Sequence, residues 1–282
     1  MTELRRLMLQ AMTVRGMARR TQQSYVSAVR RLAKHYRRSP DQVTTDEVQS
    51  YLARMIEVEG LSWSTCSVAA HAFRFFYHVT LGLKAIDFVV PQPRQPQRRL
   101  PEILSTAEVS RLFASVAHPK HRLVLETIYA CGLRVSEAIQ LKVRDMDRDR
   151  MTVRIEQGKG SKDRYVPLSK RLLQRLDQYW ATERPRHWVF EGSTAHRCLH
   201  ITAVQRAYTL AKRRAGIQKH GGVHALRHAY ATHLIESGEN VLTVQRLLGH
   251  RSVSTTMRYF HLSQARIAIV RSPLDLLDGL RL

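Results

Sequence analysis

The sequence is poor in cysteine. Three cysteines, Cys66, Cys131 and Cys198, lie far apart in 282 residues. Their odd number and wide spacing leave neither a disulfide framework nor a C-x-x-C metal pair, which favours a reducing compartment. Long hydrophobic runs are missing as well. The first ten residues have no apolar core typical of a signal peptide, and nothing approaches the ~18 apolar residues of a membrane span. We therefore expect a soluble intracellular protein.

Acidic side chains are also scarce. The chain has 46 Lys and Arg against 23 Asp and Glu, a formal net charge of +23. Residues 1–99 carry 16 basic and 7 acidic side chains, and residues 100–282 carry 30 and 16, so both halves are basic. Such an excess repels itself unless a polyanion neutralises it, which makes nucleic acid the first partner to expect. The corresponding location is the cytoplasm, at the nucleoid when DNA is bound.

A proline-rich stretch divides the sequence. Residues 89–102 contain four prolines, which neither a helix nor a central strand tolerates. We predict a helical domain of about four helices over 1–90, a linker over 91–101 and a second domain over 102–282. The length of 282 residues suits two domains.

The second domain is predicted to be mainly helical around a small β-hairpin. Ser105 opens a capping box with Glu108. Val153 and Ile155 alternate with polar residues, and a glycine-rich turn separates them from a second apolar run at 165–168, which indicates two antiparallel strands. The sequence pattern predicts further helices at about 169–181, 201–214, 224–237 and 241–248.

The segment 224–237 combines an apolar stripe with basic residues. His224 and Arg227 are three residues apart and converge on the side of the helix opposite the stripe, as does His228. A solvated polar face explains such a pair equally well. The spacing of the two histidines also suits zinc, but the glutamate of H-E-x-x-H and a third acidic ligand are missing, so a metal is not expected. The stripe consists of Leu226, Tyr230, His233 and Leu234.

Three further residues, an arginine, a lysine and a tyrosine, are candidates for a functional role. Arg134 stands at a turn after Gly132, where an anion would stabilise it, although Glu137 offers a salt bridge instead. Lys159 lies between glycines at the hairpin tip, where a solvated turn is the alternative. Gly249 suits a left-handed helix end, and a lone tyrosine, Tyr259, follows ten residues later.

In order and spacing, these pieces resemble the tyrosine recombinase (phage integrase) family. Its G-L-R-x-S-E motif matches residues 132–137, its basic G-K-G-x-K hairpin matches 158–162, and its H-x-L-R-H motif matches 224–228. L-L-G-H follows at 247–250, with Tyr259 nine residues beyond the histidine. The resemblance covers roughly 100–271, more weakly 1–90, and is greatest to the Xer-like branch. It implies a two-domain clamp with an N-terminal SAM-like helical domain.

The resemblance also implies a reaction, in which a tyrosine attacks a DNA phosphate and forms a 3′-phosphotyrosine without metal, ATP or any other cofactor. Arg134 and Arg227 would hold the phosphate with His250, since a guanidinium donates two parallel hydrogen bonds. A phenol with a pKa near ~10 needs a base, for which His224 is the candidate, and Lys159 would protonate the leaving 5′-oxygen. The predicted catalytic residues are Arg134, Lys159, His224, Arg227, His250 and Tyr259.

The expected partner is double-stranded DNA with inverted-repeat half-sites, bound by a dimer per site and a tetramer in the synapse, with no role for a membrane. The alternatives are a non-catalytic DNA-binding regulator, a type IB topoisomerase-like enzyme that nicks and reseals, and, less favoured, a cysteine or metal hydrolase. The side chains predicted to contact DNA are Arg19, Arg20, Arg74, Lys162 and Arg164.

Overall fold

The computed structural model describes residues 2–83, 88–91, 102–156, 163–194, 196–250 and 252–262, with side chains as far as Tyr259 in the last range. The chain is divided into two compact units, Met1–Arg99 and Leu100–Leu282. No helix among these residues is long and apolar enough to cross a membrane.

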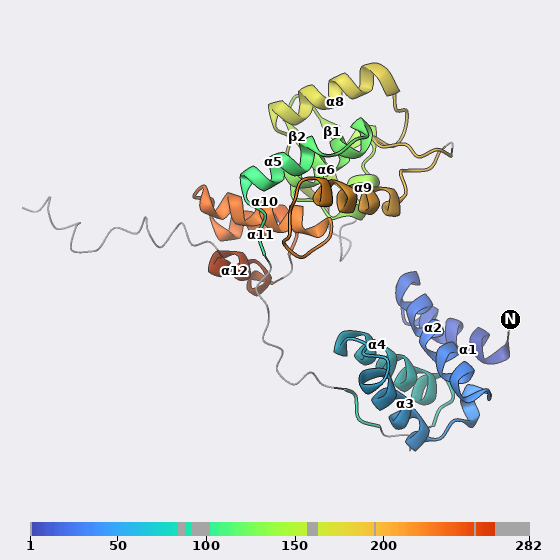
Figure 1. Cartoon of the computed structure of the whole chain (residues 1–282). Coiled ribbons are helices and arrows are strands. Elements are labelled where there is room, and N and C mark those ends of the chain that lie inside the picture. The colour runs from blue at the N-terminus through green and yellow to red at the C-terminus, as the bar shows by residue number, and fades with distance from the viewer. Residues whose placement is uncertain are drawn as a thin grey trace, which may run out of the picture. The chain divides into compact units, whose positions relative to one another are not determined.

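The N-terminal unit is helical. Its elements are α1 (Glu3–Val14), α2 (Arg19–Tyr36), the 3-10 turn η1 (Pro40–Gln42), α3 (Thr45–Glu57), α4 (Trp63–Arg74) and the π-helical turn η2 (Phe75–Thr80) (Figure 1). Thr44 caps α3 through a capping box, in which the Glu47 side chain accepts from the Thr44 backbone. Met12, Leu32 and Phe73 meet in the core with no exposed surface.

The helical elements of the C-terminal unit are α5 (Thr106–Ala114), α6 (Pro119–Cys131), α7 (Val135–Ile139), η3 (Val143–Asp145), α8 (Lys170–Glu183), α9 (Ile201–Arg214), α10 (His224–Glu236), α11 (Val241–Leu248) and α12 (Val253–Leu262). They surround the buried helix α6, which packs against α8, α9 and α10 (Figure 1). Ser105 caps α5 with Glu108 as the sequence predicted. The four helices predicted after the hairpin are therefore confirmed within one or two residues.

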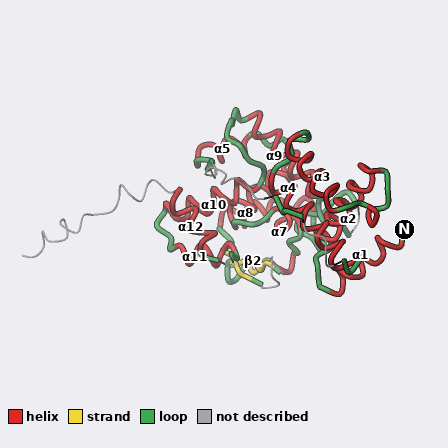
Figure 2. The backbone as a smooth tube through the Cα atoms, turned by 90° about the horizontal axis from the view of Figure 1, so that it is seen from below, coloured by secondary structure: helices red, strands yellow, loops and turns green. Residues whose placement is uncertain are grey.

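A three-stranded antiparallel sheet confirms the predicted hairpin and adds a short strand. The strands are β1 (Met146–Asp147), β2 (Thr152–Ile155) and β3 (Arg164–Pro167), in that order. Val153 pairs with Val166, and both are fully buried, whereas Tyr165 on the other face is 60% exposed. Figure 2 shows how small a part of the molecule the strands make up.

Helix α10 is buried on two sides. Tyr230 of the predicted apolar stripe is 8% exposed and Arg227 on the opposite side is 1% exposed, so Arg227 does not lie on the solvated polar face that the sequence left open as an alternative. Both sides are buried because α10 packs against α6, α11 and α12 at once. A helix with several packing partners buries basic residues as well as apolar ones, so its sequence pattern alone does not identify the solvent side.

Candidate active site

A sharp turn after α6 positions Arg134. The helix ends at Gly132, whose φ of 61° is left-handed and where a Cβ would lie 2.4 Å from ring carbons of Tyr230, so only glycine fits. Two residues later Arg134 caps α7, with its side chain 25% exposed. The sequence therefore places a partly exposed guanidinium next to a tightly packed turn.

The carboxylate of Glu137 forms ion pairs with three arginines. Arg134 Nη1 donates to its carboxylate at 2.6 Å, and Arg164 donates from both Nη atoms at 2.8 and 3.0 Å. Arg227 Nη1 lies 3.7 Å away. Burial by itself would raise the pKa of Glu137, but the hydrogen bonds and charge of Arg164, together with Arg134, lower it to about 2. One carboxylate among three guanidinium groups leaves a net positive site, which suits an anion.

Arg227 is held by backbone carbonyls. Its Nη1 donates to Gly132 O at 2.7 Å and its Nη2 to Leu248 O at 2.6 Å, so the turn after α6 and the end of α11 fix the guanidinium. Burial and the charge of Arg134 lower its pKa to about 10, which still leaves it protonated at neutral pH. Within the described residues its buried Nε has no hydrogen-bond partner. A buried donor without an acceptor is costly, and an incoming anion would satisfy it.

Tyr259 is brought to this cluster by α12, which packs on α10 and α11. The side chain is 4% exposed and shares an apolar cluster with Tyr230, Val244 and Leu248. Burial raises the pKa of the phenol, while Arg227, Arg258 and Arg134 act in the opposite direction. The phenol is thus buried, yet the positive charges of the arginines favour its ionised form.

His250 follows the left-handed helix end at Gly249, where φ is 64° as expected from the sequence. Its ring stacks on the Tyr259 ring at 6.2 Å between centroids, and its Nδ1 lies 2.9 Å from the Thr256 hydroxyl. Burial, then the charge of Arg227, lowers the pKa of His250 to about 4, so the ring is neutral at pH 7. When Thr256 donates to Nδ1, the proton of His250 lies on Nε2, ready to be donated.

The hydrogen bond of the phenol goes to a histidine that the sequence reasoning did not choose. Tyr259 Oη lies 2.8 Å from His228 Nδ1, whereas His224, the candidate base, contacts the His228 ring edge to face at 4.5 Å between centroids. His224 is exposed, and its pKa is lowered by desolvation and by Arg227 and Arg134. The helical spacing of four residues placed both histidines on one side but did not say which one meets the tyrosine.

Lys159 and Lys162 lie outside the described residues. Arg164 requires a correction. It was expected to contact DNA, but its side chain is 9% exposed. Both Nη atoms are bound to Glu137, and Nε donates to Leu247 O at 2.8 Å. With these groups engaged inside the protein, Arg164 joins α7, β3 and α11 and does not face a partner.

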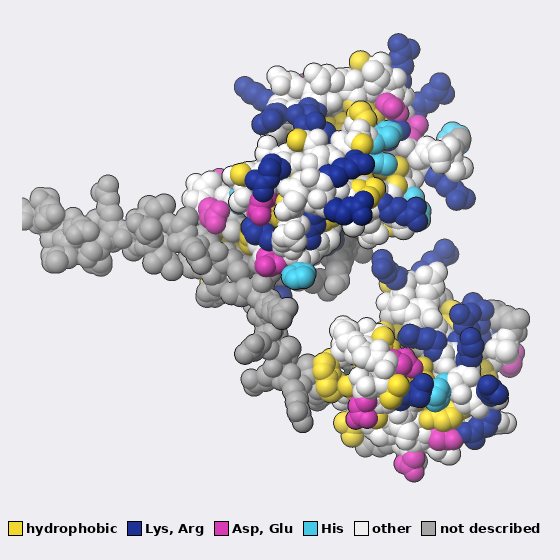
Figure 3. Space-filling model, viewed as in Figure 1, with side chains coloured by type: hydrophobic (Ala, Val, Ile, Leu, Met, Phe, Trp, Pro, Cys, Tyr) yellow, Lys and Arg dark blue, Asp and Glu magenta, His cyan; other side chains and the backbone are white. Residues whose placement is uncertain are grey.

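A polar groove of about 530 Å³ lies between α2 and α4 in the N-terminal unit. Arg20 and Arg31 line it, both exposed, and Figure 3 shows many more basic than acidic side chains on this unit. Arg19 is exposed beside Arg20, whereas Arg74 is half-buried and donates to Phe88 O at 3.2 Å. The sequence reasoning missed Arg31, although eleven residues, about three helical turns, place it on the face of Arg20. The groove also contains Gln23, Ser24, Ser27, Ser64 and Thr65.

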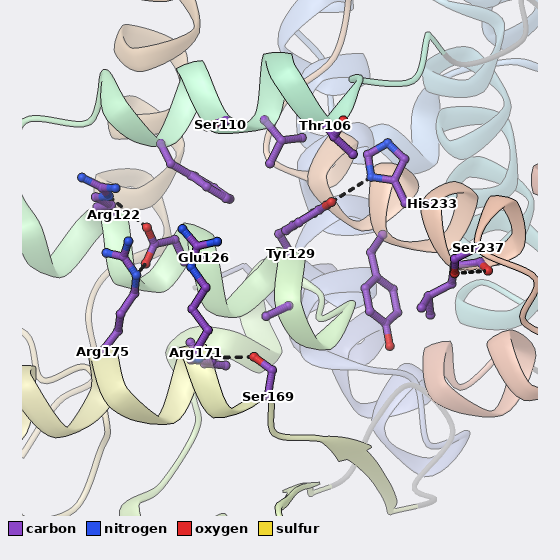
Figure 4. A pocket seen from close by; sticks show the side chains of 16 residues that line it. Thr106, Ser110, Arg122, Glu126, Tyr129, Ser169, Arg171, Arg175, His233 and Ser237 are labelled. Carbon is purple, nitrogen blue, oxygen red and sulfur yellow. Dashed lines mark hydrogen bonds and ion pairs between the residues drawn. The ribbon is translucent and has the colours of Figure 1, made fainter.

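A cavity of about 540 Å³ opens elsewhere in the C-terminal unit, among α5, α6, α8 and α10 (Figure 4). Tyr129 Oη lies 2.8 Å from His233 Nδ1 at one end, and Glu126 binds Arg122 and Arg175 at the other. None of the five predicted catalytic residues that the structure describes lines this cavity. In the part of the chain that the structure describes, no group of three His, Cys, Asp or Glu side chains is arranged to hold a metal ion.

Comparison with known proteins decides the family. Residues 99–266 match the phage integrase family, and residues 4–87 match the N-terminal SAM-like domain of phage integrases. The chain belongs to the phage integrase family. An integrase/recombinase of Escherichia coli is 36% identical over 305 aligned positions, covering 93% of this chain and 90% of that one. The tyrosine recombinase XerC of Proteus mirabilis is 34% identical over 224 residues, covering 75% of this chain and 72% of that one.

Solved structures of integrases share the fold. A lambda integrase dimer bound to a core site superposes with a TM-score of 0.72 at 19% identity, covering 92% of this chain and 93% of that one. The XerH recombinase bound to its difH substrate gives 0.64 at 22% identity, covering 80% and 71%. The family and the relatives named as recombinases establish this chain as a tyrosine site-specific recombinase.

Proposed function

We propose that Tyr259 is the nucleophile with which this recombinase cleaves duplex DNA and forms a 3′-phosphotyrosine. The observation that carries the proposal is Arg227, a buried cation that the fold holds by two carbonyl groups with one donor left unsatisfied, and whose charge acts on the Tyr259 phenol. Arg134 adds a second positive charge near the phenol, and the neutral ring of His250 adds a hydrogen-bond donor next to it. A phosphate is the anion whose shape and charge match such a set of donors.

The chemistry follows from the charges. As the Tyr259 oxygen approaches phosphorus, negative charge builds on the two non-bridging oxygens, and Arg134 and Arg227 stabilise it. Removing one donor from such a preorganised site costs ~10²–10³ in rate. Lys159 is the candidate that gives a proton to the departing 5′-oxygen. The phosphotyrosine ester conserves the energy of the broken bond, so a 5′-hydroxyl from another strand reverses the step without ATP.

Double-stranded DNA is the substrate that the charge supports. Both units are basic, and together they suit a clamp that grips one duplex from two sides. The groove of Arg20 and Arg31, with its hydroxyl groups, is the candidate contact of the N-terminal unit with phosphates. The solved relatives named above were crystallised on DNA, which supports the same partner.

Assembly on DNA is the second part of the proposal. Strand exchange joins two sites, so we expect inverted-repeat half-sites bound by a dimer and a synapse of four protomers. Residues 263–282 lie outside the described residues. Their sequence has an apolar series at Ile267, Ile269 and Val270, then a Ser-Pro break and three leucines, and we expect this tail to dock on a neighbouring protomer.

A nicked suicide duplex, from which the cleaved 5′ fragment diffuses away, tests the nucleophile. We expect Tyr259→Phe to bind this DNA as the wild-type chain does but to form no SDS-resistant adduct. Tyr230→Phe is the matched control, because it lies in the same cluster and should still form the adduct. An adduct on the Tyr259→Phe chain would show that another residue is the nucleophile.

The same assay in excess chelator tests the predicted independence of metal. Adduct formation should persist, because the arginines supply the positive charge that a metal ion would otherwise provide, and the histidines supply hydrogen bonds. Loss of the adduct in EDTA, with recovery on adding a divalent ion, would contradict this expectation.

A further inference from the structure

His228 is the hydrogen-bond partner that the structure gives to the Tyr259 phenol. The distance from Tyr259 Oη to His228 Nδ1 is 2.8 Å, and the ring centroids lie 5.5 Å apart. Among the residues that the structure describes, no hydrogen bond joins this phenol to His224, whose position in the H-x-L-R-H motif had made it the candidate base. The two histidines are one helical turn apart, so only the docking of α12 decides between them.

The direction of this hydrogen bond follows from the surroundings. Burial, then His224, Arg227 and Arg258, lowers the pKa of His228 to about 4, so its ring is neutral at pH 7. Burial raises the pKa of Tyr259, so the phenol keeps its proton. A neutral imidazole has one acceptor nitrogen and a phenol has one proton, so Tyr259 donates and Nδ1 accepts.

We infer that His228, rather than His224, receives the Tyr259 proton when the phenol attacks DNA, and this rests on the proposed role of Tyr259. The O–H bond of Tyr259 breaks as its proton moves to Nδ1, and the bond from the phenol oxygen to phosphorus forms. The bond from phosphorus to the 5′-oxygen breaks, and that oxygen takes its proton from Lys159. On rejoining, the incoming 5′-hydroxyl returns its proton to Lys159, and His228 protonates the leaving phenolate.

Bound DNA would make His228 a better base than it is in the free chain. Arg227 is one of the cations that keep His228 neutral, and it is also a proposed phosphate ligand. A phosphate carrying negative charge at Arg227 offsets the field of that arginine at His228, so protonation becomes easier when substrate is present. His224, exposed at the edge of the site, is left to donate to the phosphate.

Single-turnover cleavage of the suicide duplex, followed across pH, distinguishes the two histidines. His228→Asn keeps an acceptor oxygen near the position of Nδ1 but takes no proton, and His224→Asn is the matched control. We expect His228→Asn to slow cleavage by ~10²–10⁴. The cleavage rate of the His228→Asn chain should increase with pH, because more of the phenol is then ionised without a base. A fluorinated tyrosine of lower pKa at position 259 should restore part of the lost cleavage rate. His224→Asn should show neither the increase nor the restoration.

A second measurement separates proton transfer from packing. DNA carrying a 3′-para-nitrophenyl phosphate stands in for the phosphotyrosine in a Tyr259→Phe chain, and its leaving group needs no proton. Adding His228→Asn should then slow rejoining far less than it slows cleavage. If His228→Asn lowers the melting temperature, His228→Gln replaces it in both assays.

The outcomes are distinct. If the cleavage rate of His228→Asn depends on pH as that of the wild-type chain does, the role of His228 is overturned. The same conclusion follows if the rate increases with pH in His224→Asn instead. Neither result affects the role of Tyr259 as the nucleophile. An equal loss in the nitrophenyl assay shows that His228 acts by packing alone and also overturns the inference. No adduct on the wild-type chain removes the proposed role of Tyr259 and this inference with it.

Discussion

At the scale of single residues, the site depends on how few negative charges it contains. Glu137 faces Arg134, Arg164 and Arg227, so the cluster stays cationic while Arg164 is held in the interior. If each arginine had its own carboxylate, the site would be neutral and phosphate would compete poorly. Glu137 therefore fixes the arginines without cancelling their charge.

We predict that Glu137→Gln lowers the free energy of unfolding by about 3–5 kcal/mol at pH 7, because it leaves buried guanidinium groups without their counter-charge. The Glu137 pKa of about 2 lies below its ordinary 4.5, so its contribution is present above pH 4.5 and is lost as the pH falls toward 2. Urea unfolding at several pH values measures this.

Glu156→Gln is the control for this prediction. Its side chain is 29% exposed and pairs with Lys142 and Arg154 near the surface, where water screens the charges, so the loss should be much smaller than for Glu137→Gln. An equal effect of both substitutions, or a Glu137→Gln effect that does not shrink in acid, would contradict the assigned role of Glu137.

At the scale of elements, the turn after α6 determines the position of Arg134. It also determines the position of the Gly132 carbonyl, which accepts a hydrogen bond from Arg227. Gly132 provides a left-handed residue, a backbone acceptor for Arg227 and the space that the Tyr230 ring fills. Three elements, α6, α7 and α10, therefore meet at one residue without a side chain.

We predict that Gly132→Ala destabilises the protein by roughly 2–5 kcal/mol, combining ~1–2 for the left-handed backbone and ~1–3 for overpacking against Tyr230. Gly216→Ala is the matched control. Its φ of 66° is similar, but a Cβ there meets nothing within 4 Å, so only the backbone cost should appear. Thermal melting of both variants compares them, and equal losses would rule out the packing contribution.

Local signals explain how much of this the sequence could predict. The capping box at Ser105, the glycine end at Gly249 and the alternation at Val153 act within a few residues, so the helix and hairpin boundaries were predictable. The burial of Arg227 was not, because it depends on α11 and α12 folding over α10. Arg164 looked like a surface arginine of a basic hairpin for the same reason. Its partner Glu137 is 27 residues away in the sequence.

At the scale of the whole molecule, charge governs the encounter with DNA. A net charge of +23 draws the chain to any duplex, and only contacts to base edges distinguish sites. The six predicted catalytic residues are all in the C-terminal unit, while the N-terminal unit carries its own basic groove. Affinity is thus expected to come from both units and chemistry from one.

We predict a steep fall of DNA affinity with salt, with a log–log slope of about −0.9 for each phosphate contacted. Replacing Arg20 and Arg31 by alanine should make the slope shallower by about 2 if each holds one phosphate. Arg5→Ala with Arg6→Ala, two arginines outside the groove, is the control. Fluorescence anisotropy over a range of salt measures the slope, and an unchanged slope in the groove variant would exclude the groove as a DNA contact.

Truncation after residue 271 tests the proposed assembly. The shortened chain should bind a single half-site as well as the full chain but lose cooperative pairing on a full site, together with recombination. Gel shifts on half-sites and full sites, with melting temperatures, separate these effects. Normal recombination would deny the tail a role in assembly, and loss of folding would show that it packs on its own protomer.

The burial of Tyr259 bears on how long a phosphotyrosine would survive before it is hydrolysed. A phosphotyrosine that water could reach would hydrolyse and leave a permanent strand break, since the energy needed to reseal it would be lost. With a side chain 4% exposed among apolar neighbours, the ester would form where water is scarce and a tethered DNA hydroxyl is the favoured attacker. On the proposed role of Tyr259, the apolar surroundings that raise the pKa of its phenol would therefore also protect the cut DNA from hydrolysis until it is rejoined.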